Sequence, residues 1–373
     1  MKISYDTQIF CSQTYGGVSR YFCEIASRLF EDPGLEISIA APLYINSYLP
    51  NLPSGIVTGF RAPRVERFNS KYLKLLFRGA GLMLGDIALR TQCPDIVHET
   101  YYFAQPLGPR HARRVLTIYD MIHERFPSDF PLADKTSRYK AAAAKRADHV
   151  ICISEATRAD VIEFLNLPPE KISVIHLGFD LMKPRTEAFA KLGGKTDGPF
   201  LLYVGNRGGY KNFLRLLDAY ASSPTLRYQF KLVCFGGGPF SAEEREKITR
   251  LHLTSDQVVQ FGGNDEILSG LYARASAFVY PSLYEGFGIP PLEAMSHGCP
   301  VVCAATSSIP EVVGNGGEYF DPADIGSIRE SIERVVGSES HRDVLVRKGR
   351  ARLDSFSWDR CAHETLNVYR RLA

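Results

Sequence analysis

Short apolar runs alternate with helix-patterned segments along most of the chain, and this alternation constrains the fold more than any other feature. The runs have the length and composition of buried strands, and the segments between them repeat apolar residues at helical spacing. Parallel neighbouring strands need a long crossover connection, which a helix usually supplies. The alternation therefore predicts an α/β fold with parallel, doubly wound sheets. Strands are expected at residues 2–5, 36–41, 95–99, 115–120, 149–154, 172–176, 200–204, 231–235, 258–261 and 275–280.

Length and composition fit two such domains. A chain of 373 residues can build two separate cores. Its 45% hydrophobic and 23% charged residues are usual for a water-soluble protein, and a net charge of +3 argues against nucleic-acid binding over the whole surface. Residues 181–199 are rich in Lys, Gly, Pro and Thr and predict a linker. We therefore expect an N-terminal domain at 1–180 and a C-terminal domain at 200–356.

The cysteines and the apolar runs indicate a cytoplasmic protein. None of the eight cysteines forms a C-x-x-C pair, and three of them lie inside strand-like runs, which predicts reduced, buried thiols. Residues 1–3 lead directly into a strand, so no signal peptide is expected. No apolar run approaches the roughly 20 residues that a membrane span needs.

The stretch from Tyr284 to Pro300 follows a predicted strand and contains a glycine loop, a pair of prolines and two glutamates. Glycines let the backbone approach a ligand closely, and prolines suit the first turn of a helix. The pattern predicts a loop and a helix whose N-terminus favours an anion, above all a phosphate. Glu285 and Glu293 flank this site, where carboxylates can accept hydrogen bonds from the hydroxyls of a ribose or a sugar. The structural alternative is a tight turn with a helix-capping glutamate.

A second glycine loop, residues 205–212, lies between a predicted strand and a predicted helix. It carries Arg207 and Lys211. Cations in such a loop can neutralise a diphosphate and stabilise it as it leaves.

The N-terminal half offers two further candidate segments. Tyr15–Arg20 includes Gly16 and Gly17 at the ligand-facing corner of a doubly wound sheet, although a plain tight turn is the alternative. It lacks the G-x-G-x-x-G pattern, so no dinucleotide site is predicted. Asp120 and His123 follow the strand expected at 115–120 and are candidates for a hydrogen-bonding pair, with a structural histidine as the alternative.

Residues 61–78 form a basic, aromatic-bearing segment with a single acidic residue, Glu66. Such a segment can rest on an anionic membrane surface, which predicts peripheral attachment. A solvated helix that packs its apolar face inward is the alternative. The basic residues are Arg61, Arg64, Arg67, Lys71, Lys74 and Arg78.

Glu285 and Glu293, with seven residues between them, resemble the E-x7-E signature of retaining glycosyltransferases of the GT-B fold, in particular family 4. The run from Glu285 to Val302 is similar to that family almost position by position, and bacterial polysaccharide mannosyltransferases are the most similar members. The resemblance implies two Rossmann-like doubly wound domains facing across a cleft, with the C-terminal helix, 357–373, packing back on the first domain. The C-terminal domain would bind the nucleotide-sugar and the N-terminal domain the acceptor.

The same resemblance implies roles for the candidate residues. Glu285 would lie by the donor sugar and Glu293 would hold the nucleotide ribose. Lys211 matches the family's phosphate-binding lysine, whereas Arg207 is displaced by one position from its arginine. Tyr119 stands where the family has histidine, beside Asp120 and His123 in the segment that touches the transferred sugar. The remaining donor contacts would come from Gly16, Gly17, Gly286, Phe287, Gly288 and Ile289.

We therefore expect a retaining, metal-independent transfer of mannose from GDP-mannose to a saccharide or polyprenyl-linked saccharide, without a cofactor. The chain contains no Asp-x-Asp triplet, which agrees with the absence of a metal. A UDP-sugar donor is an alternative, and a nucleotide-sugar epimerase is a rival function. A non-catalytic sugar-nucleotide binding protein would not need the leaving-group cations, and an NAD-dependent oxidoreductase would need the missing glycine motif.

Overall fold

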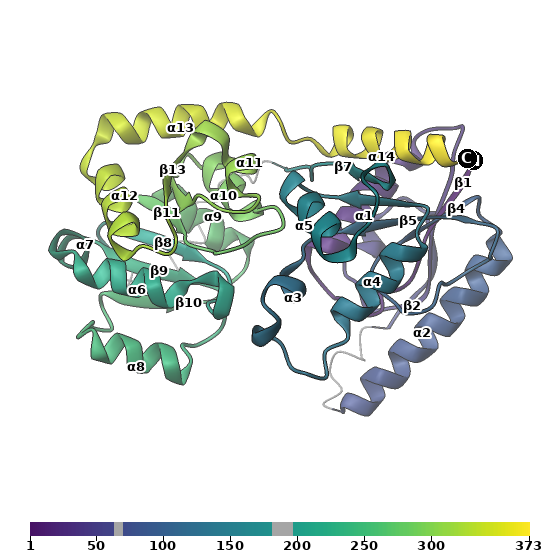
Figure 1. The fold of residues 1–373 in the computed structure, drawn as a ribbon, viewed down its shortest axis with the longest axis horizontal. Helices are drawn as coiled ribbons and strands as arrows, with labels where there is room; N and C mark the ends of the chain where they lie inside the picture. The colour runs from purple at the N-terminus through teal and green to yellow at the C-terminus, as the bar shows by residue number, and fades with distance from the viewer. Residues whose placement is uncertain (63–69, 181–196) are drawn as a thin grey trace. The chain divides into compact units, whose positions relative to one another are not determined.

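A computed structural model describes residues 1–62, 70–180 and 197–373. The chain divides into two compact units (Figure 1). Unit 1 comprises residues 1–178 and 357–373, and unit 2 comprises residues 179–356. The predicted linker lies mostly outside the described residues, since 181–196 are not described.

Unit 1 is built on a seven-stranded, all-parallel sheet in the order β3-β2-β1-β4-β5-β6-β7. The order changes direction at β1 and β4, and the carboxyl ends of these neighbouring strands form the switch point where doubly wound sheets bind ligands. The sequence did not predict β3, because this edge strand is exposed and lacks an apolar run. The strands are β1 (Lys2–Tyr5), β2 (Glu36–Tyr44), β3 (Val57–Arg61), β4 (Ile96–Glu99), β5 (Arg113–Ile118), β6 (His149–Cys152) and β7 (Ile172–Val174).

Helices cover this sheet, and one of them comes from the far end of the chain. The C-terminal helix α14 lies in unit 1, where Asp359 pairs with Arg28 at 2.6 Å and the hydroxyl of Tyr369 lies 2.5 Å from Nδ1 of His98. The helices of unit 1 are α1 (Gly17–Phe30), α2 (Lys71–Gln92), α3 (Ile122–Arg125), α4 (Thr136–Arg146), α5 (Glu155–Leu165) and α14 (Trp358–Leu372).

Unit 2 repeats the architecture with a six-stranded parallel sheet in the order β10-β9-β8-β11-β12-β13. Its switch point lies between β8 and β11. The strands are β8 (Phe200–Val204), β9 (Lys231–Phe235), β10 (Val258–Phe261), β11 (Ala277–Tyr280), β12 (Val301–Ala304) and β13 (Gly317–Phe320). The helices are α6 (Phe213–Ser222), α7 (Pro224–Gln229), α8 (Ala242–Arg250), α9 (Asp265–Arg274), α10 (Ile289–Ser296), α11 (Ile309–Val313), α12 (Ile325–Gly337) and α13 (Glu339–Leu353).

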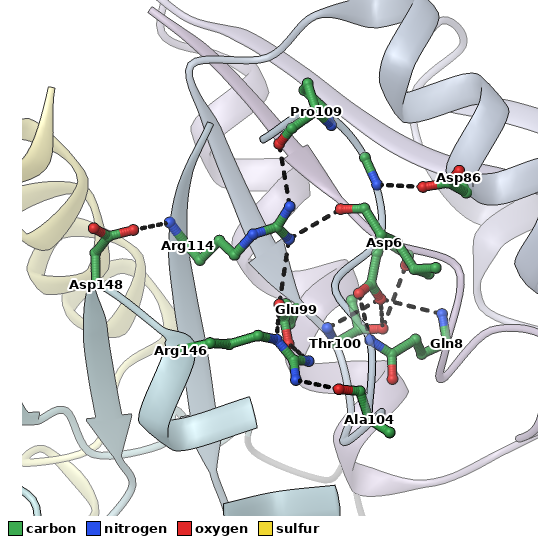
Figure 2. Close-up of polar contacts among 12 residues, drawn as sticks. Asp6, Gln8, Asp86, Glu99, Thr100, Ala104, Pro109, Arg114, Arg146 and Asp148 are labelled. Carbon is green, nitrogen blue, oxygen red and sulfur yellow. Dashed lines mark hydrogen bonds and ion pairs between the residues drawn. The ribbon is translucent and has the colours of Figure 1, made fainter. Parts of the chain in front are cut away.

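A buried ion network shapes the loop that follows β4 (Figure 2). Glu99 is 1% exposed and accepts two hydrogen bonds from Arg146, at 3.1 and 2.5 Å, and one from Arg114 at 3.3 Å. Arg114 also donates to the main-chain oxygens of Leu107 and Pro109, at 2.9 and 3.1 Å. The network therefore ties the loop to the sheet through main-chain oxygens of the loop.

The cysteines are free, and all except Cys93 are buried. The expected buried thiols are thus confirmed for seven of the eight. In the described ranges, no helix is long and apolar enough to cross a membrane. No group of three or more His, Cys, Asp or Glu residues in those ranges is arranged to hold a metal ion.

Candidate active site

The two residues expected at the donor diphosphate and sugar meet in unit 2. Nζ of Lys211 lies 2.6 Å from Oε1 of Glu285, and both side chains are largely buried. Lys211 ends a short 3-10 turn after β8, and Glu285 lies in the loop after β11. Because β8 and β11 are neighbours in a parallel sheet, their carboxyl-end loops lie side by side. A main-chain hydrogen bond of 2.7 Å from Leu283 to Tyr210 joins the two loops directly.

The loop that carries Glu285 is held by two hydroxyls from the segment after β12. The Glu285 amide donates to Oγ of Ser307 at 2.9 Å. Oγ of Ser308, which is fully buried, lies 2.8 Å from the carbonyl oxygens of both Glu285 and Phe287. Neither serine was predicted from the sequence as part of the site. Their only signal was a position just after an apolar strand, where loop residues of a parallel sheet collect.

The glycine loop runs directly into helix α10, as predicted. Gly288 occupies the N-cap position with φ 110°, a left-handed conformation that favours glycine, and prolines fill the first turn. The positive end of the helix dipole therefore lies next to Glu285 and its loop, in a position that favours a phosphate. The residues implied to contact the donor, Gly286, Phe287, Gly288 and Ile289, form the entry to this helix.

Glu293 lies on α10 and is anchored from α9. The hydroxyl of Tyr272 donates to Oε2 of Glu293 at 3.1 Å. Burial raises the pKa of Tyr272 well above its usual value, and the charge of Glu293 raises it further, so the phenol stays a donor. Glu293 is half-buried, and the Tyr272 hydroxyl holds Oε2 of its carboxylate.

Arg207 projects from its own loop and is buried against the turn after β9. Its guanidinium donates to the carbonyl oxygens of Gly236 and Gly238 at 2.7 Å and of Pro239 at 3.0 Å, and its Nε donates to Oε1 of Glu244 at 2.9 Å. Only 2% of the side chain is exposed. The glycines that it holds, residues 236–238, all have positive φ. Arg207 thus stabilises the turn after β9, and its expected contact with the donor diphosphate stays a prediction.

Unit 1 places Gly16 and Gly17 at the start of α1. A Cβ atom on Gly16 would lie 2.3 Å from the side chain of Gln13, whose Oε1 accepts a hydrogen bond from the Ser19 amide. Gly16 therefore permits a close approach, whereas a Cβ atom on Gly17 would meet nothing within 4 Å.

The expected pair between Asp120 and His123 is wrong for this structure. Oδ1 of Asp120 accepts a hydrogen bond from the Ile122 amide at 3.1 Å, two residues further along the chain. The ring of His123 stacks on Phe130 at 3.8 Å, and its Nε2 lies 3.9 Å from Asp134. Its buried Nδ1 has no hydrogen-bond partner among the described residues.

Lys140, which was not a candidate from the sequence, contacts the segment from Asp120 to Glu124. It is completely buried, and its Nζ donates to the carbonyl oxygen of Asp120 at 2.9 Å and to Glu124 at 2.8 Å. A lysine in α4 and a glutamate in α3 give no sequence signal of such a contact, because the 16 to 20 residues between the partners are brought together only by the fold.

Two family descriptions together cover most of the chain. Residues 15–183 match Glycosyltransferase Family 4, and residues 184–352 match Glycosyl transferases group 1. The O-antigen chain mannosyltransferase B of Escherichia coli is 32% identical over 299 residues, which are 76% of each chain. The serotype-specific mannosyltransferase WbdA of Escherichia coli is 29% identical over 312 residues, which are 77% of this chain and 38% of that protein.

Solved structures agree on the fold. The sucrose-phosphate synthase of Thermosynechococcus elongatus superposes with a TM-score of 0.73 at 22% identity, covering 100% of this chain and 98% of that one. The two parallel α/β units, each with a switch point at the carboxyl ends of its central strands, are those of the GT-B fold. The chain therefore belongs to the family 4, group 1 glycosyltransferases, and it is a glycosyltransferase.

Proposed function

We propose that this enzyme transfers mannose from GDP-mannose to a hydroxyl of a saccharide or lipid-linked saccharide in bacterial polysaccharide synthesis. The observation that supports it most is the contact between Lys211 and Glu285 beside the N-terminus of α10. This arrangement combines a cation, a helix dipole and a carboxylate, which suit a diphosphate joined to a sugar. The names of the relatives, both mannosyltransferases, favour mannose as the sugar.

In this proposal, different residues of unit 2 bind different parts of the donor. Lys211 and the entry to α10 take the diphosphate and stabilise its charge as the bond to the sugar breaks. Glu285 accepts hydrogen bonds from sugar hydroxyls, and it also holds Lys211 in place. Glu293 accepts from the ribose, with Tyr272 fixing the carboxylate.

The transfer itself is proposed to retain the configuration of the anomeric carbon and to need no metal. The acceptor hydroxyl attacks from the face on which the nucleoside diphosphate departs. The bond from the anomeric carbon to the phosphate oxygen breaks and a new glycosidic bond forms. The hydroxyl proton passes to the departing phosphate oxygen, so no protein base is required.

We also propose that unit 1 contacts a membrane surface through α2. This helix has large apolar side chains on its outer side, at Tyr72, Leu76, Met83 and Ile87, which are 81%, 69%, 62% and 53% exposed. Their spacing of four, seven and four residues places them on one helix face. The opposite face packs on the unit through Leu89, which lies in a core cluster with Ala40 and Val97. Arg64 and Arg67, which contributed to this expectation, lie outside the described residues.

An outward apolar face on a surface helix is the reverse of the usual pattern. Lys74 and Arg78 are exposed on the same helix, and Asp86, its one acidic residue, pairs with Arg90 at 2.8 Å. Apolar side chains together with excess positive charge suit an anionic lipid surface.

The donor proposal is tested by incubating the purified enzyme with GDP-mannose or UDP-glucose and a membrane-lipid extract. Transfer of labelled mannose, with release of GDP, is expected only from GDP-mannose. Transfer from UDP-glucose alone would overturn the choice of donor. Isomerised donor without acceptor would overturn the transferase mechanism. Addition of EDTA is expected to leave the rate unchanged.

A further inference from the structure

Asn212 follows Lys211 directly, and its side chain is buried between three loops of unit 2. Its Nδ2 donates to the carbonyl oxygen of Pro281, just after β11, at 3.0 Å. The same nitrogen donates to the carbonyl oxygen of Pro322, in the segment after β13, at 2.9 Å. One side chain therefore joins the loops that follow β8, β11 and β13, and both hydrogens of its amide nitrogen are used.

The neighbours of Asn212 fix which way its amide points. Its Oδ1 accepts from Nη1 of Arg215 at 3.0 Å, while its nitrogen faces two carbonyl oxygens, which can only accept. With nitrogen and oxygen exchanged, an N–H group would face a guanidinium and the amide oxygen would face two other oxygens. The hydrogen-bond network therefore determines the orientation, and a carboxylate of the same shape could not replace the amide.

The backbone at Asn212 also depends on this residue type. It has φ 59° and ψ 26°, a left-handed conformation that asparagine adopts more readily than most residues other than glycine. The Asn212 amide closes the 3-10 turn Gly209–Lys211, and its carbonyl oxygen accepts from the Leu216 amide in α6. The turn that ends with Lys211 is thus joined to α6 by a single residue of defined backbone conformation.

Lys211 and Asn212 reach the same loop at two points. Nζ of Lys211 lies 2.6 Å from Oε1 of Glu285, and the Asn212 side chain holds Pro281, four residues earlier. The lysine side chain is long and flexible, whereas the asparagine side chain is short and hydrogen-bonded at both ends of its amide. Asn212 therefore sets the spacing of the two loops, and this spacing keeps the ammonium of Lys211 within reach of Glu285.

The backbone on the other side of this contact is unusual as well. Ser307, whose Oγ accepts from the Glu285 amide at 2.9 Å, has a left-handed backbone with φ 49°. Left-handed residues other than glycine are uncommon, cost free energy and tend to gather at functional sites. One such residue supports Lys211 and the other supports Glu285, which indicates that the fold is strained in order to hold this pair.

We propose that Asn212 is a positioning residue for glycosyl transfer, which holds the ammonium of Lys211 where the nucleoside diphosphate departs. This rests on the proposed function, in which Lys211 stabilises the departing diphosphate. Asn212 itself contacts no part of the donor. It acts on the rate of the chemical step, because a displacement of about 1 Å in a group that stabilises the transition state can cost roughly 100-fold.

The first test is a double-mutant cycle on kcat, measured with the full chain, GDP-mannose and a membrane-lipid extract. Asn212→Gly leaves the left-handed backbone accessible and removes only the side-chain contacts. It should lower kcat about tenfold or more and change the KM for GDP-mannose less. In a Lys211→Gln background, Asn212→Gly should change kcat by less than about twofold, because the residue acts through Lys211.

Two controls separate positioning from a general loss of stability. Gln257→Ala removes another amide of unit 2, which donates to the carbonyl oxygen of Arg227 at 2.9 Å and lies before β10, at the amino end of the strand. Asn166→Gly makes the same exchange at a left-handed residue of unit 1, with φ 51°. Both should keep kcat within about twofold of wild type.

A second cycle uses urea unfolding of the unliganded protein and does not depend on the donor. Lys211→Gln, Glu285→Gln and their double variant give the coupling between the two charges, first in the wild-type background and then with Asn212→Gly. The coupling should shrink in the second background. If Asn212→Gly does not fold, Asn212→Asp takes its place in both cycles, because aspartate tolerates the same backbone and cannot donate.

Three results would overturn the proposal. The first is a multiplication of the two kcat losses when Asn212→Gly is combined with Lys211→Gln, since Asn212 would then act independently of the lysine. The second is a kcat loss no larger than that of the controls, and the third is equal charge coupling in both backgrounds. If the wild type transfers no mannose from GDP-mannose and the coupling still shrinks, the proposed function fails and the positioning of Lys211 by Asn212 stands.

Discussion

Lys211 and Glu285 lie 74 positions apart in the sequence, and their charged groups are 2.6 Å apart in the fold. Replacing Lys211 with Gln should lower kcat by about 100- to 1,000-fold, because a positioned donor to the departing phosphate is lost. Steady-state transfer with GDP-mannose measures the effect, and circular dichroism checks the fold.

The matched control for Lys211→Gln is Lys247→Gln. Lys247 also forms a partly buried pair in unit 2, at 2.5 Å from Asp218, but lies on α8 away from α10. It should lose stability without losing kcat. A Lys211→Gln enzyme within a few-fold of normal turnover would contradict the assignment.

Tyr272→Phe should raise the KM for the donor several-fold and leave kcat nearly unchanged, since the hydroxyl only fixes the Glu293 carboxylate. The folding free energy should fall by about 1 kcal/mol with the lost hydrogen bond. Tyr220→Phe removes a comparable buried hydroxyl, which donates to the carbonyl oxygen of Phe230 at 2.7 Å. It should lower stability similarly and leave KM unchanged. If both variants show the same KM, Glu293 is not a donor contact.

Arg207→Gln should destabilise unit 2 by about 3 kcal/mol or more, because Glu244 and the carbonyl oxygens of the turn lose a buried cation. Urea denaturation followed by far-UV circular dichroism measures the free energy of unfolding. Arg215→Gln, on α6, is the control and should cost less stability. This arginine donates to two neutral acceptors, the carbonyl oxygen of Pro322 and Oδ1 of Asn212. Unchanged stability of Arg207→Gln, with weaker donor binding, would show that the arginine acts on the ligand instead.

The triple variant Leu76→Ser, Met83→Ser and Ile87→Ser should float with anionic vesicles at least about tenfold less well than wild type, because each apolar side chain contributes to membrane contact. Leu132→Ser with Tyr228→Ser changes apolar residues that are even more exposed, outside α2, and serves as the control. Self-association of the wild type that the triple variant abolishes would indicate that a second protein copy, rather than lipid, covers this face.

Acid should destabilise unit 1 through His98. Burial lowers the pKa of His98 to about 3 from a usual value near 6.5, so the unfolded chain takes up a proton that the folded chain refuses. The contribution of neutral, buried His98 to the free energy of unfolding is therefore fully present above pH 6.5. It is lost as the pH falls toward 3, by up to about 1.4 kcal/mol per pH unit. His98→Asn should be less stable at pH 7, yet its deficit should shrink at pH 5. Exposed His363→Asn is the control, and a deficit for His98→Asn that does not change with pH would contradict the mechanism.

Much of the architecture follows from local patterns. The buried strands are continuous apolar runs, and β11, its glycine loop and α10 lie where the pattern around Glu285 predicts them. The exposed edge strand β3 escaped detection because neither of its faces is strongly apolar. Residue type singled out Lys211 and Glu285 as candidates, and the fold brings them within 2.6 Å of each other because loops after adjacent parallel strands converge.

Partners across long sequence separations could not be predicted in the same way. Arg207 was expected at a phosphate and is held by carbonyl groups of the turn after β9, about 30 residues away. A short separation was no safer guide. Asp120 and His123 are three residues apart, yet Asp120 accepts a hydrogen bond from the Ile122 amide and His123 stacks on Phe130.

The sequence by itself determined the two parallel sheets and the glycine loop that leads into α10, because strand length, helical spacing and glycine conformation are local properties. Only the tertiary structure decided that Arg207 is buried within its own unit and that Asn212 joins three loops beside Lys211. The reason is that a polar side chain is defined by what surrounds it, and those surroundings come from chain segments that only the fold brings together.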